Sequence, residues 1–236
     1  QWEPQNYDKK FNKFITMRNA LTKSKNLVSI RILQSITPAY GKKYIEKFGF
    51  DSKKHPAFLT LALGAGTVTP LQLATGYAIF ANGGYKVYPH FIQRIEDSLG
   101  NVLAMSNYPK SGYKYKPIID PRIAFIMTNM LQDVVKRGTG RKALSIGRTD
   151  LSGKTGTTND QIDAWFAGYQ KNLVAVSWVG FSNPKTLGEH ETGAAAALPI
   201  WISYMREVLK NQPEELHVVP DGVTAIAIDP KENFVE

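Results

Sequence analysis

Apolar residues return every three to four positions in six segments of the chain, which predicts amphipathic helices there. The predicted helices cover residues 14–23, 27–36, 40–48, 70–82, 121–137 and 198–210. Two of them have a strong start signal, because a capping residue stands directly before a proline at Thr69-Pro70 and at Asp120-Pro121. Glycines end both helices, at Gly83 and Gly138.

The same spacing predicts which side of each helix is buried. In the helix over 121–137 the stripe consists of Ile123, Ile126, Met127, Met130, Leu131, Val134 and Val135. The last helix is predicted to bury Trp201, Met205, Val208 and Leu209, and the helix over 27–36 to bury Val28, Ile32 and Leu33. Thr37-Pro38 is interpreted as the stop of that helix, and Gly49 as the end of the helix over 40–48.

Strands are predicted where aromatic and β-branched residues are dense. Residues 164–169 and 173–181 form a hairpin around a short turn at 170–172, and residues 85–105 form strands around a turn at 97–101. Residues 106–119 are a Tyr/Lys/Pro loop, and residues 223–228 are one short strand in a polar tail that starts at 212. Since neighbouring strands are tightly connected, we expect an α/β protein of the α+β type, with an antiparallel sheet covered by helices.

Composition narrows the choice of function. Among 236 residues there are 29 Lys and Arg, 20 Asp and Glu, and no Cys, so disulfides and thiolate metal sites are excluded. The net charge of +9 suits acidic partners such as nucleic acid, but no run of five basic residues occurs, so a solvated basic surface is favoured. No apolar run approaches the roughly 18 residues of a membrane span. The start at Gln1, without Met, is interpreted as a cut end.

Ser152-Gly-Lys-Thr-Gly-Thr-Thr-Asn159 is the stretch most suggestive of chemistry. A phosphate-binding loop is the weaker interpretation, because Gly147 and Gly153 are separated by five residues rather than four. The alternative is a Lys-Thr-Gly edge strand of a serine acyl-transfer enzyme. There Lys154 would offer a cation, and Thr155 and Thr157 hydroxyls, to a substrate carboxylate. Gly156 would let the substrate lie against the strand, and the N–H near Thr157 would supply half of an oxyanion hole.

Ser24-Lys25-Asn26 interrupts two helical patterns and is a second candidate element. Ser24 could relay a proton to a leaving amine, and Asn26 could hold a catalytic lysine and contact a substrate amide. Taken alone, the pair is better explained as a helix cap, where Ser and Asn are common. Its position before Lys-Thr-Gly is the order found in penicillin-recognising serine enzymes.

The flanks of these motifs resemble the transpeptidase domain of class A, bifunctional penicillin-binding proteins. The matching stretches are residues 20–31, 61–89, 147–160 and 163–166. The resemblance implies the fold shared by penicillin-binding proteins and serine β-lactamases, an antiparallel sheet flanked by helices on both faces. It also implies that residues 1–211 are part of a transpeptidase domain, followed by a C-terminal tail over 212–236.

The family's nucleophile stands in a Ser-x-x-Lys motif before Ser-x-Asn, and the 23 residues before Ser24 contain none. Ser111–Lys114 and Ser182–Lys185 match in the wrong order, and Gly112 and Pro184 make both poor helices. We therefore expect the nucleophile upstream of Gln1. Gly138-Thr139-Gly140-Arg141 either borders the cleft or is only a helix end. Asp163 and Trp165 could line the site, although packing is favoured for Trp165. His55, His90, His190 and His217 share no metal spacing.

The resemblance implies D-Ala-D-Ala transpeptidation of peptidoglycan, with Ser24, Asn26 and Lys154 as catalytic residues and Thr155, Gly156 and Thr157 as substrate-binding residues. No metal or organic cofactor is expected. The implied partners are stem peptides, lipid II-derived strands, β-lactams and the upstream part of the same protein. The implied location is the periplasmic face of the bacterial inner membrane, through an anchor outside this chain. The alternatives are a carboxypeptidase or β-lactamase-like hydrolase, for which no clear Glu loop is found, and a non-catalytic peptidoglycan-binding module.

Overall fold

The main sheet is built from the second half of the chain, and the helices come from both halves. The structure is a computed structural model that describes residues 2–11, 14–106, 116–224 and 226. Its α-helices are α1 Met17–Thr22, α2 Asn26–Ile36, α3 Pro38–Tyr44, α4 Pro70–Ala81, α5 Pro121–Arg137 and α6 Leu198–Val208. Its strands are β1 Arg94–Glu96, β2 Val102–Met105, β3 Ser152–Thr157, β4 Ala164–Gln170 and β5 Leu173–Val179.

Shorter helical turns connect these elements. The 3-10 turns are η1 Ile45–Phe48, η2 Ser52–Lys54, η3 Leu59–Leu63, η4 Arg141–Ile146 and η5 Asn159–Gln161, and a π-helical turn, η6 Gly193–Ala197, runs directly into α6. No helix in the described part of the chain has the length and apolarity needed to cross a membrane.

The sheet has the strand order β3-β4-β5, and both pairs are antiparallel. The two-residue turn at Lys171 and Asn172 fixes the register of β4 with β5, so that Trp165 lies opposite Trp178. In the other pair, Gly156 of β3 lies opposite Trp165. The hairpin predicted over 164–181 is therefore confirmed. The Lys-Thr-Gly strand lies at one edge of this three-stranded sheet, as expected.

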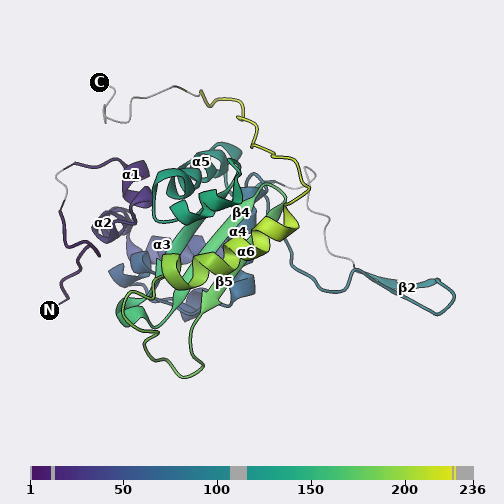
Figure 1. The fold of residues 1–236 in the computed structure, drawn as a ribbon, viewed down its shortest axis with the longest axis horizontal. Coiled ribbons are helices and arrows are strands. Elements are labelled where there is room, and N and C mark those ends of the chain that lie inside the picture. Colours follow the sequence, from purple (N-terminus) through teal and green to yellow (C-terminus); the bar gives the residue numbers. More distant parts are fainter. Residues whose placement is uncertain (1, 12–13, 107–115, 225, 227–236) are drawn as a thin grey trace.

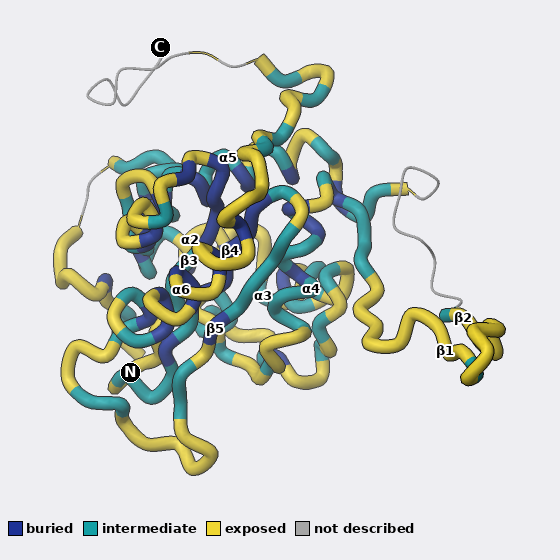
Figure 2. The backbone as a smooth tube through the Cα atoms, turned by 45° about the vertical axis from the view of Figure 1, so that its right-hand side comes forward, coloured by how far each residue is buried: buried dark blue, intermediate teal, exposed yellow. Residues whose placement is uncertain are grey.

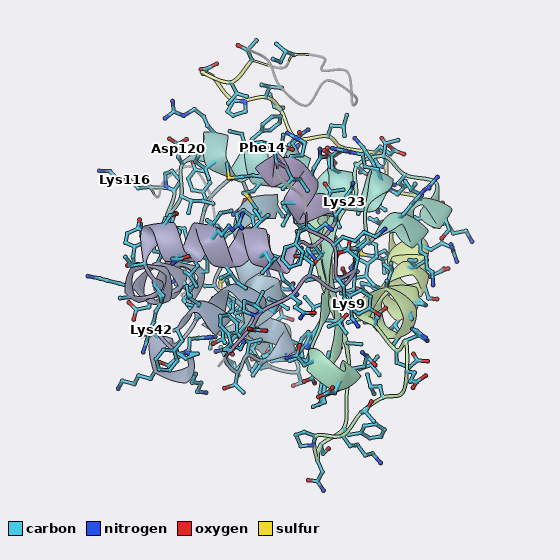
Figure 3. All side chains as sticks on the ribbon, turned by 90° about the vertical axis from the view of Figure 1, so that its left-hand side faces the viewer. Lys9, Phe14, Lys23, Lys42, Lys116 and Asp120 are labelled. Atoms are coloured by element: carbon cyan, nitrogen blue, oxygen red, sulfur yellow. The ribbon has the colours of Figure 1, made fainter. Side chains whose placement is uncertain are left out.

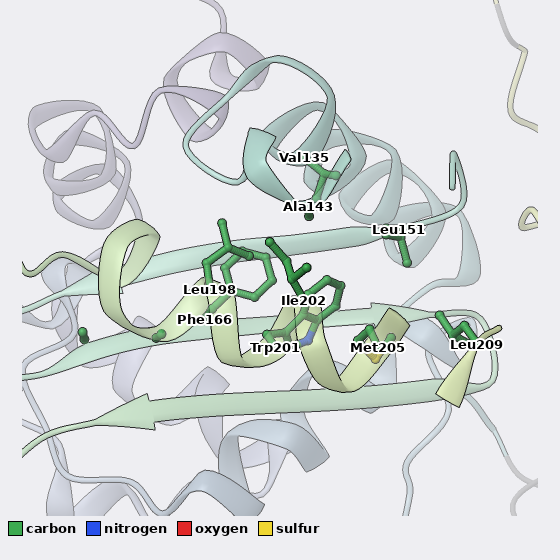
Figure 4. Packing of buried hydrophobic residues seen from close by; sticks show 11 residues of the cluster. Val135, Ala143, Leu151, Phe166, Leu198, Trp201, Ile202, Met205 and Leu209 are labelled. Atoms are coloured by element: carbon green, nitrogen blue, oxygen red, sulfur yellow. The ribbon is translucent and has the colours of Figure 1, made fainter. Parts of the chain in front are cut away.

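Helices cover both faces of the sheet, as Figure 1 shows with α6 in front of the strands and α4 behind them. Alternate residues of β4 point to opposite faces. Phe166 packs on Trp201 of α6 with ring centroids 4.9 Å apart, as Figure 4 shows, whereas Tyr169 meets Tyr77 of α4 at 6.3 Å. The largest buried cluster lies on the α6 side and also includes Val135 of α5. The fold class predicted from the sequence is confirmed.

The buried side of α5 differs from the predicted stripe. Leu131, Val134 and Val135 are buried, but Ile123 and Ile126 are 50% and 41% exposed. Small residues are buried in their place: Thr128 turns toward the sheet, and Ala124 packs with Ile79 of α4. Thr128 Oγ1 also hydrogen-bonds Tyr169 Oη at 2.9 Å. A polar contact, invisible to a hydrophobicity pattern, thus sets the rotation of this helix.

Other boundaries also shift. Pro38 does not merely stop α2: it is the first residue of α3, with Thr37 as its cap. On α2, Ile30 and Leu33 are buried while Ile32 is 40% exposed. On the last helix Trp201 and Met205 are buried as predicted, but Val208 is 39% exposed, because the helix ends there and Leu209 turns inward instead. The first predicted helix forms only from Met17, after the cap at Thr16.

The predicted strand region 85–105 is shorter than expected. Only β1 and β2 form, and this hairpin projects from the body of the molecule, fully exposed in Figure 2. Most of the predicted loop 106–119 and most of the predicted strand 223–228 fall outside the described residues. Basic side chains such as Lys9, Lys23 and Lys116 are exposed, as Figure 3 shows, which agrees with a solvated basic surface.

Candidate functional site

A tight turn between α1 and α2 holds Ser24. The N–H of Ser24 donates to Leu21 O at 3.1 Å and that of Lys25 to Ala20 O at 2.9 Å, which closes α1. Ser24 has φ 53°, in the left-handed region that a residue with a Cβ rarely adopts. This conformation costs about 1–2 kcal/mol relative to glycine. A serine kept in it despite that strain indicates that its side chain has a use.

Lys154 reaches this turn from the edge strand β3. Its Nζ donates to Ser24 Oγ at 2.8 Å and to the carbonyl oxygen of Thr155 at 2.9 Å. Burial lowers the pKa of Lys154 to about 8. The structure thus brings Ser24 of one predicted motif into contact with Lys154 of the other. Because its pKa is about 8, the amine of Lys154 can lose its proton at mildly alkaline pH.

The two predicted hydroxyls lie on one side of β3, where each already has a partner. Thr155 Oγ1 lies 2.7 Å from Thr139 Oγ1, and Thr157 Oγ1 accepts a hydrogen bond of 3.0 Å from the N–H of Gly193. The backbone of Gly193 packs closely against the sheet, since a Cβ there would be 2.4 Å from the carbonyl oxygen of Gly156. Each hydroxyl keeps further hydrogen-bonding capacity for a ligand.

A cavity of about 320 Å³ opens beside the strand. Its floor is formed by Lys154, Thr155, Gly156 and Thr157 of β3 together with Trp165 of β4. The opposite wall comes from the helical part of the chain and is mostly apolar, with Phe50, His55, Leu61, Leu63, Leu73 and Tyr77. A substrate group can therefore enter between the edge strand and the helices.

Asn26 is placed elsewhere. It is the first residue of α2, and its Nδ2 donates to the carbonyl oxygen of Gln5 at 3.0 Å. The preceding segment is tied to the same turn, because Asn6 Oδ1 accepts from Leu27 N at 3.2 Å and Asp8 forms an ion pair with the buried Lys25. Of the predicted catalytic residues, the structure brings Ser24 and Lys154 into contact, whereas the side-chain amide of Asn26 contacts the N-terminal segment.

The remaining candidates are separated or structural. Asp163 Oδ1 accepts from Trp178 Nε1 at 2.7 Å, and Trp165 packs on Trp178 with centroids 5.8 Å apart. Ser182–Lys185 lie in a stretch without regular structure, as their Pro184 predicts, and Ser111–Lys114 lie outside the described residues. Within the described ranges, no three or more His, Asp or Glu side chains gather as a metal ion requires.

Two contacts at this site were not predicted from the sequence, namely the Asp8–Lys25 ion pair and the Thr139–Thr155 hydroxyl pair. For Gly138–Arg141 the sequence indicates only a turn that either borders the cleft or ends a helix. Both contacts join segments that are apart in the sequence, so residue spacing carries no signal for them.

Comparison with known proteins identifies the family. The family model described as penicillin binding protein transpeptidase domain matches residues 1–200. Penicillin-binding protein 1A of Neisseria flavescens is 47% identical over 222 residues and that of Pseudomonas aeruginosa 43% over 274 residues, covering 94% and 97% of this chain. The chain belongs to the penicillin-binding protein transpeptidase family, as its resemblance implied.

Solved structures agree. Penicillin-binding protein 1A of Haemophilus influenzae superposes with a TM-score of 0.86 at 31% identity, over 93% of this chain and 38% of the other. PonA1 of Mycobacterium tuberculosis gives 0.76 at 23% identity, over 95% of this chain and 67% of the other, which supports the fold alone. The chain spans only 28% and 33% of the length of its Neisseria flavescens and Pseudomonas aeruginosa relatives.

Proposed function

We propose that this chain is part of a D,D-transpeptidase domain that cross-links peptidoglycan stem peptides ending in D-Ala-D-Ala. The observation that carries the proposal is the 2.8 Å hydrogen bond from Lys154 Nζ to Ser24 Oγ, which joins the two motifs in a family known by its penicillin binding. The nucleophile is assigned to a Ser-x-x-Lys segment of the whole polypeptide that lies outside residues 1–236.

The reaction follows the chemistry of a serine acyl transfer. The nucleophile's oxygen forms a bond to the penultimate D-Ala carbonyl carbon while the lysine of its Ser-x-x-Lys segment takes the hydroxyl proton, and the C–N bond to the last D-Ala breaks. Ser24 gives its hydroxyl proton to the departing amine and regains one through Lys154, to which it is hydrogen-bonded. The amine of a second stem peptide then attacks the acyl-serine, the ester C–O bond breaks, and the proton lost by that amine returns to the nucleophile's oxygen. Asn26 would assist only after its amide leaves Gln5, so its role is the least supported.

Recognition rests on the substrate's terminal carboxylate. Protonated Lys154 supplies the charge, and the hydroxyls of Thr155 and Thr157 donate hydrogen bonds to the same group. Gly156 leaves the edge of β3 open beside the cavity, and a Cβ there would lie 3.2 Å from the Cβ of Trp165. The N–H of Thr157 supplies one oxyanion donor. No metal or organic cofactor takes part in these steps.

The proposal extends to the protein's organisation. Residues 1–211 form part of the transpeptidase domain, and 212–236 are a tail whose first residues contact it, since Arg148 donates to the carbonyl oxygens of Gln212 and Pro213 at 2.7 and 2.9 Å. The whole polypeptide would carry a glycosyltransferase domain and an anchor to the inner membrane, and would act on its periplasmic face on lipid II-derived strands. β-Lactams would acylate the same nucleophile.

Labelling with a fluorescent penicillin tests the proposal. The whole polypeptide that contains this chain should be labelled, and Lys154→Met should lose the label because the carboxylate loses its cation. Lys142→Ala, which removes an exposed lysine of η4, should label normally. Proteolysis followed by mass mapping should place the label outside residues 1–236; label on Ser182 or Ser111 would sink the assignment.

A second measurement separates the transpeptidase from a hydrolase of the same fold. The acyl-enzyme formed with a D-Ala-D-Ala peptide is allowed to react in the presence of a D-amino acid. Transfer of the acyl group to the added amine in preference to water supports transpeptidation. Exclusive hydrolysis would favour a carboxypeptidase, and the absence of any acyl-enzyme would favour a binding module.

A further inference from the structure

Thr139 contacts the Lys-Thr-Gly strand and the helix end that precedes Ser24. It lies in the turn between α5 and η4, and its Oγ1 is 2.7 Å from Thr155 Oγ1 on the Lys-Thr-Gly strand. Its backbone N–H donates to the carbonyl oxygen of Thr22 at 3.3 Å. Thr22 is the last residue of α1, two positions before Ser24. One residue therefore touches β3 through its side chain and the Ser24 turn through its backbone.

The turn that carries Thr139 is held firmly. The N–H groups of Gly138 and Gly140 both donate to the carbonyl oxygen of Val134, at 3.1 and 3.0 Å. Gly138 is pressed against the end of α1, since a Cβ there would lie 2.3 Å from the carbonyl oxygen of Thr22. Helix α1 packs beside α5, as Figure 1 shows. The position of Thr139 is thus set by backbone contacts rather than by its own side chain.

Helix α5 is in turn fixed to the sheet. Thr128 Oγ1 is bonded to Tyr169 Oη at 2.9 Å, and Ser152 Oγ of β3 donates to the carbonyl oxygen of Thr128 at 3.3 Å. Both hydrogen bonds are buried. Hydrogen bonds thus hold α5, β3 and the turn at 138–140 together. Thr139 is the residue of this turn whose side chain contacts the hydroxyl of Thr155.

We propose that Thr139 is a positioning residue that orients the Thr155 hydroxyl toward the substrate carboxylate; this inference rests on the proposed function. A carboxylate only accepts hydrogen bonds. When Thr155 donates to it, the hydroxyl proton shared by the two threonines must come from Thr139. Thr139 then donates to Thr155, and Thr155 to the ligand, so that each bond polarises the next. The backbone bond to Thr22 keeps this pair in register with Ser24.

Substitutions at position 139 separate positioning from simple packing. Thr139→Val keeps the size of the side chain and removes the hydroxyl, whereas Thr139→Ser keeps the hydroxyl. The probe is the second-order acylation rate of the whole polypeptide with penicillin G and with its methyl ester, which lacks the carboxylate charge. With the free acid we expect acylation of Thr139→Val to be about tenfold slower. This is the effect of losing one hydrogen bond, from Thr139 to Thr155, in a series that ends on the charged carboxylate. With the ester the change should stay below about twofold.

Thr139→Ser should restore the free-acid rate to within about threefold of the parent. Thr75→Val is the matched control, because it removes a threonine hydroxyl that donates to the carbonyl oxygen of Leu71 at 2.8 Å, at a residue of α4 that belongs to neither motif. It should leave the ratio of the acid rate to the ester rate unchanged. Equal losses with acid and ester in Thr139→Val, no loss at all, or failure of Ser to rescue would each overturn the inference.

Lys154→Met separates a failure of the proposed function from a failure of the positioning role of Thr139. If the parent protein is not acylated, or if Lys154→Met is acylated normally, the proposed function itself fails. If Lys154→Met loses acylation by the free acid while Thr139→Val does not, the function stands and the role of Thr139 is wrong. Thermal unfolding of every variant shows whether a loss of rate follows a loss of fold.

Discussion

Lys154 and Ser24 lie 130 positions apart in the chain, yet Lys154 Nζ donates a 2.8 Å hydrogen bond to Ser24 Oγ. The lysine is half-buried with a pKa lowered by that burial, and the serine has a strained backbone, so each is held in an unfavourable state by the structure around it. Such features cluster at functional sites because binding and catalysis require them and stability does not.

The first prediction concerns the pH dependence of carboxylate recognition. With a pKa lowered by burial to about 8, Lys154 loses its positive charge across mildly alkaline pH. Acylation of the whole polypeptide by penicillin G should therefore decline above about pH 8, while acylation by the methyl ester should not share that decline. Parallel profiles for the two compounds from pH 7 to 9.5 would contradict this role of the charge.

The same pKa predicts an effect on stability. Because the pKa of Lys154 is lower in the folded state, the unfolded chain binds the extra proton between about pH 8 and 10.5, and stability rises with pH across that window. Lys154→Met removes a charge whose burial is unfavourable below pH 8. We expect it to be about 2 kcal/mol more stable at pH 7, with the gain shrinking by pH 10. Urea unfolding at both pH values measures this, and a gain that does not change with pH would argue against it.

Ser24 allows strain and chemistry to be separated. Ser24→Gly and Ser24→Ala both remove the hydroxyl, so both should lower the acylation rate to a similar extent. Only glycine relieves the positive φ of 53°. We expect Ser24→Gly to be about 1 kcal/mol more stable than Ser24→Ala, as measured by denaturant unfolding. Equal stabilities would show that the backbone at this turn relaxes, and unequal rates would show that the backbone itself affects the reaction.

The sequence predicted the elements of this fold better than their rotations. Thr69-Pro70 begins α4 as expected, with the full capping box to Gln72, because such signals are local. The apolar stripe of α5 predicts the wrong inward side, since Thr128 turns to the sheet to hydrogen-bond Tyr169 Oη. That bond depends on a partner 41 residues away, which no periodicity reveals.

At the candidate site, too, some residues could be predicted from the sequence and their partners could not. Lys154, Thr155 and Thr157 were predicted from the demands of the chemistry, and their edge position follows from the hairpin after them. The roles of the partner residues could not be predicted, because they come from turns remote in the chain. Gly193 is an example: its N–H donates to Thr157 across 36 residues.

Gly138 provides a test of the turn beside the site. An added methyl group in Gly138→Ala would lie 2.3 Å from a backbone oxygen, which a side-chain movement cannot relieve. We expect a loss of about 2 kcal/mol in the free energy of unfolding and slower acylation. At Gly140 the nearest atom would be 3.3 Å away, so Gly140→Ala should lose clearly less. Equal losses for the two variants would mean that the contact with Thr22 is not what fixes the turn.

The C-terminal tail is expected to detach as the pH falls. It is held by Asp150, which accepts from the N–H of Glu215 at 3.0 Å, and by His217, whose ring meets Tyr169 edge-on with centroids 6.5 Å apart. Burial lowers the pKa of His217, and the charge of Lys171 adds to the effect, while Asp150 opposes it.

Because the folded pKa of His217 lies below the unfolded value of about 6.5, its contribution to stability is complete above that pH and is lost as the pH falls below it. Hydrogen exchange at residues 213–219, corrected for the intrinsic rate, should therefore show weaker protection at pH 5 than at pH 7. His217→Phe keeps the ring against Tyr169 and removes the titration, so its protection should not vary with pH. Equal pH dependence in the two proteins would assign the release to another group.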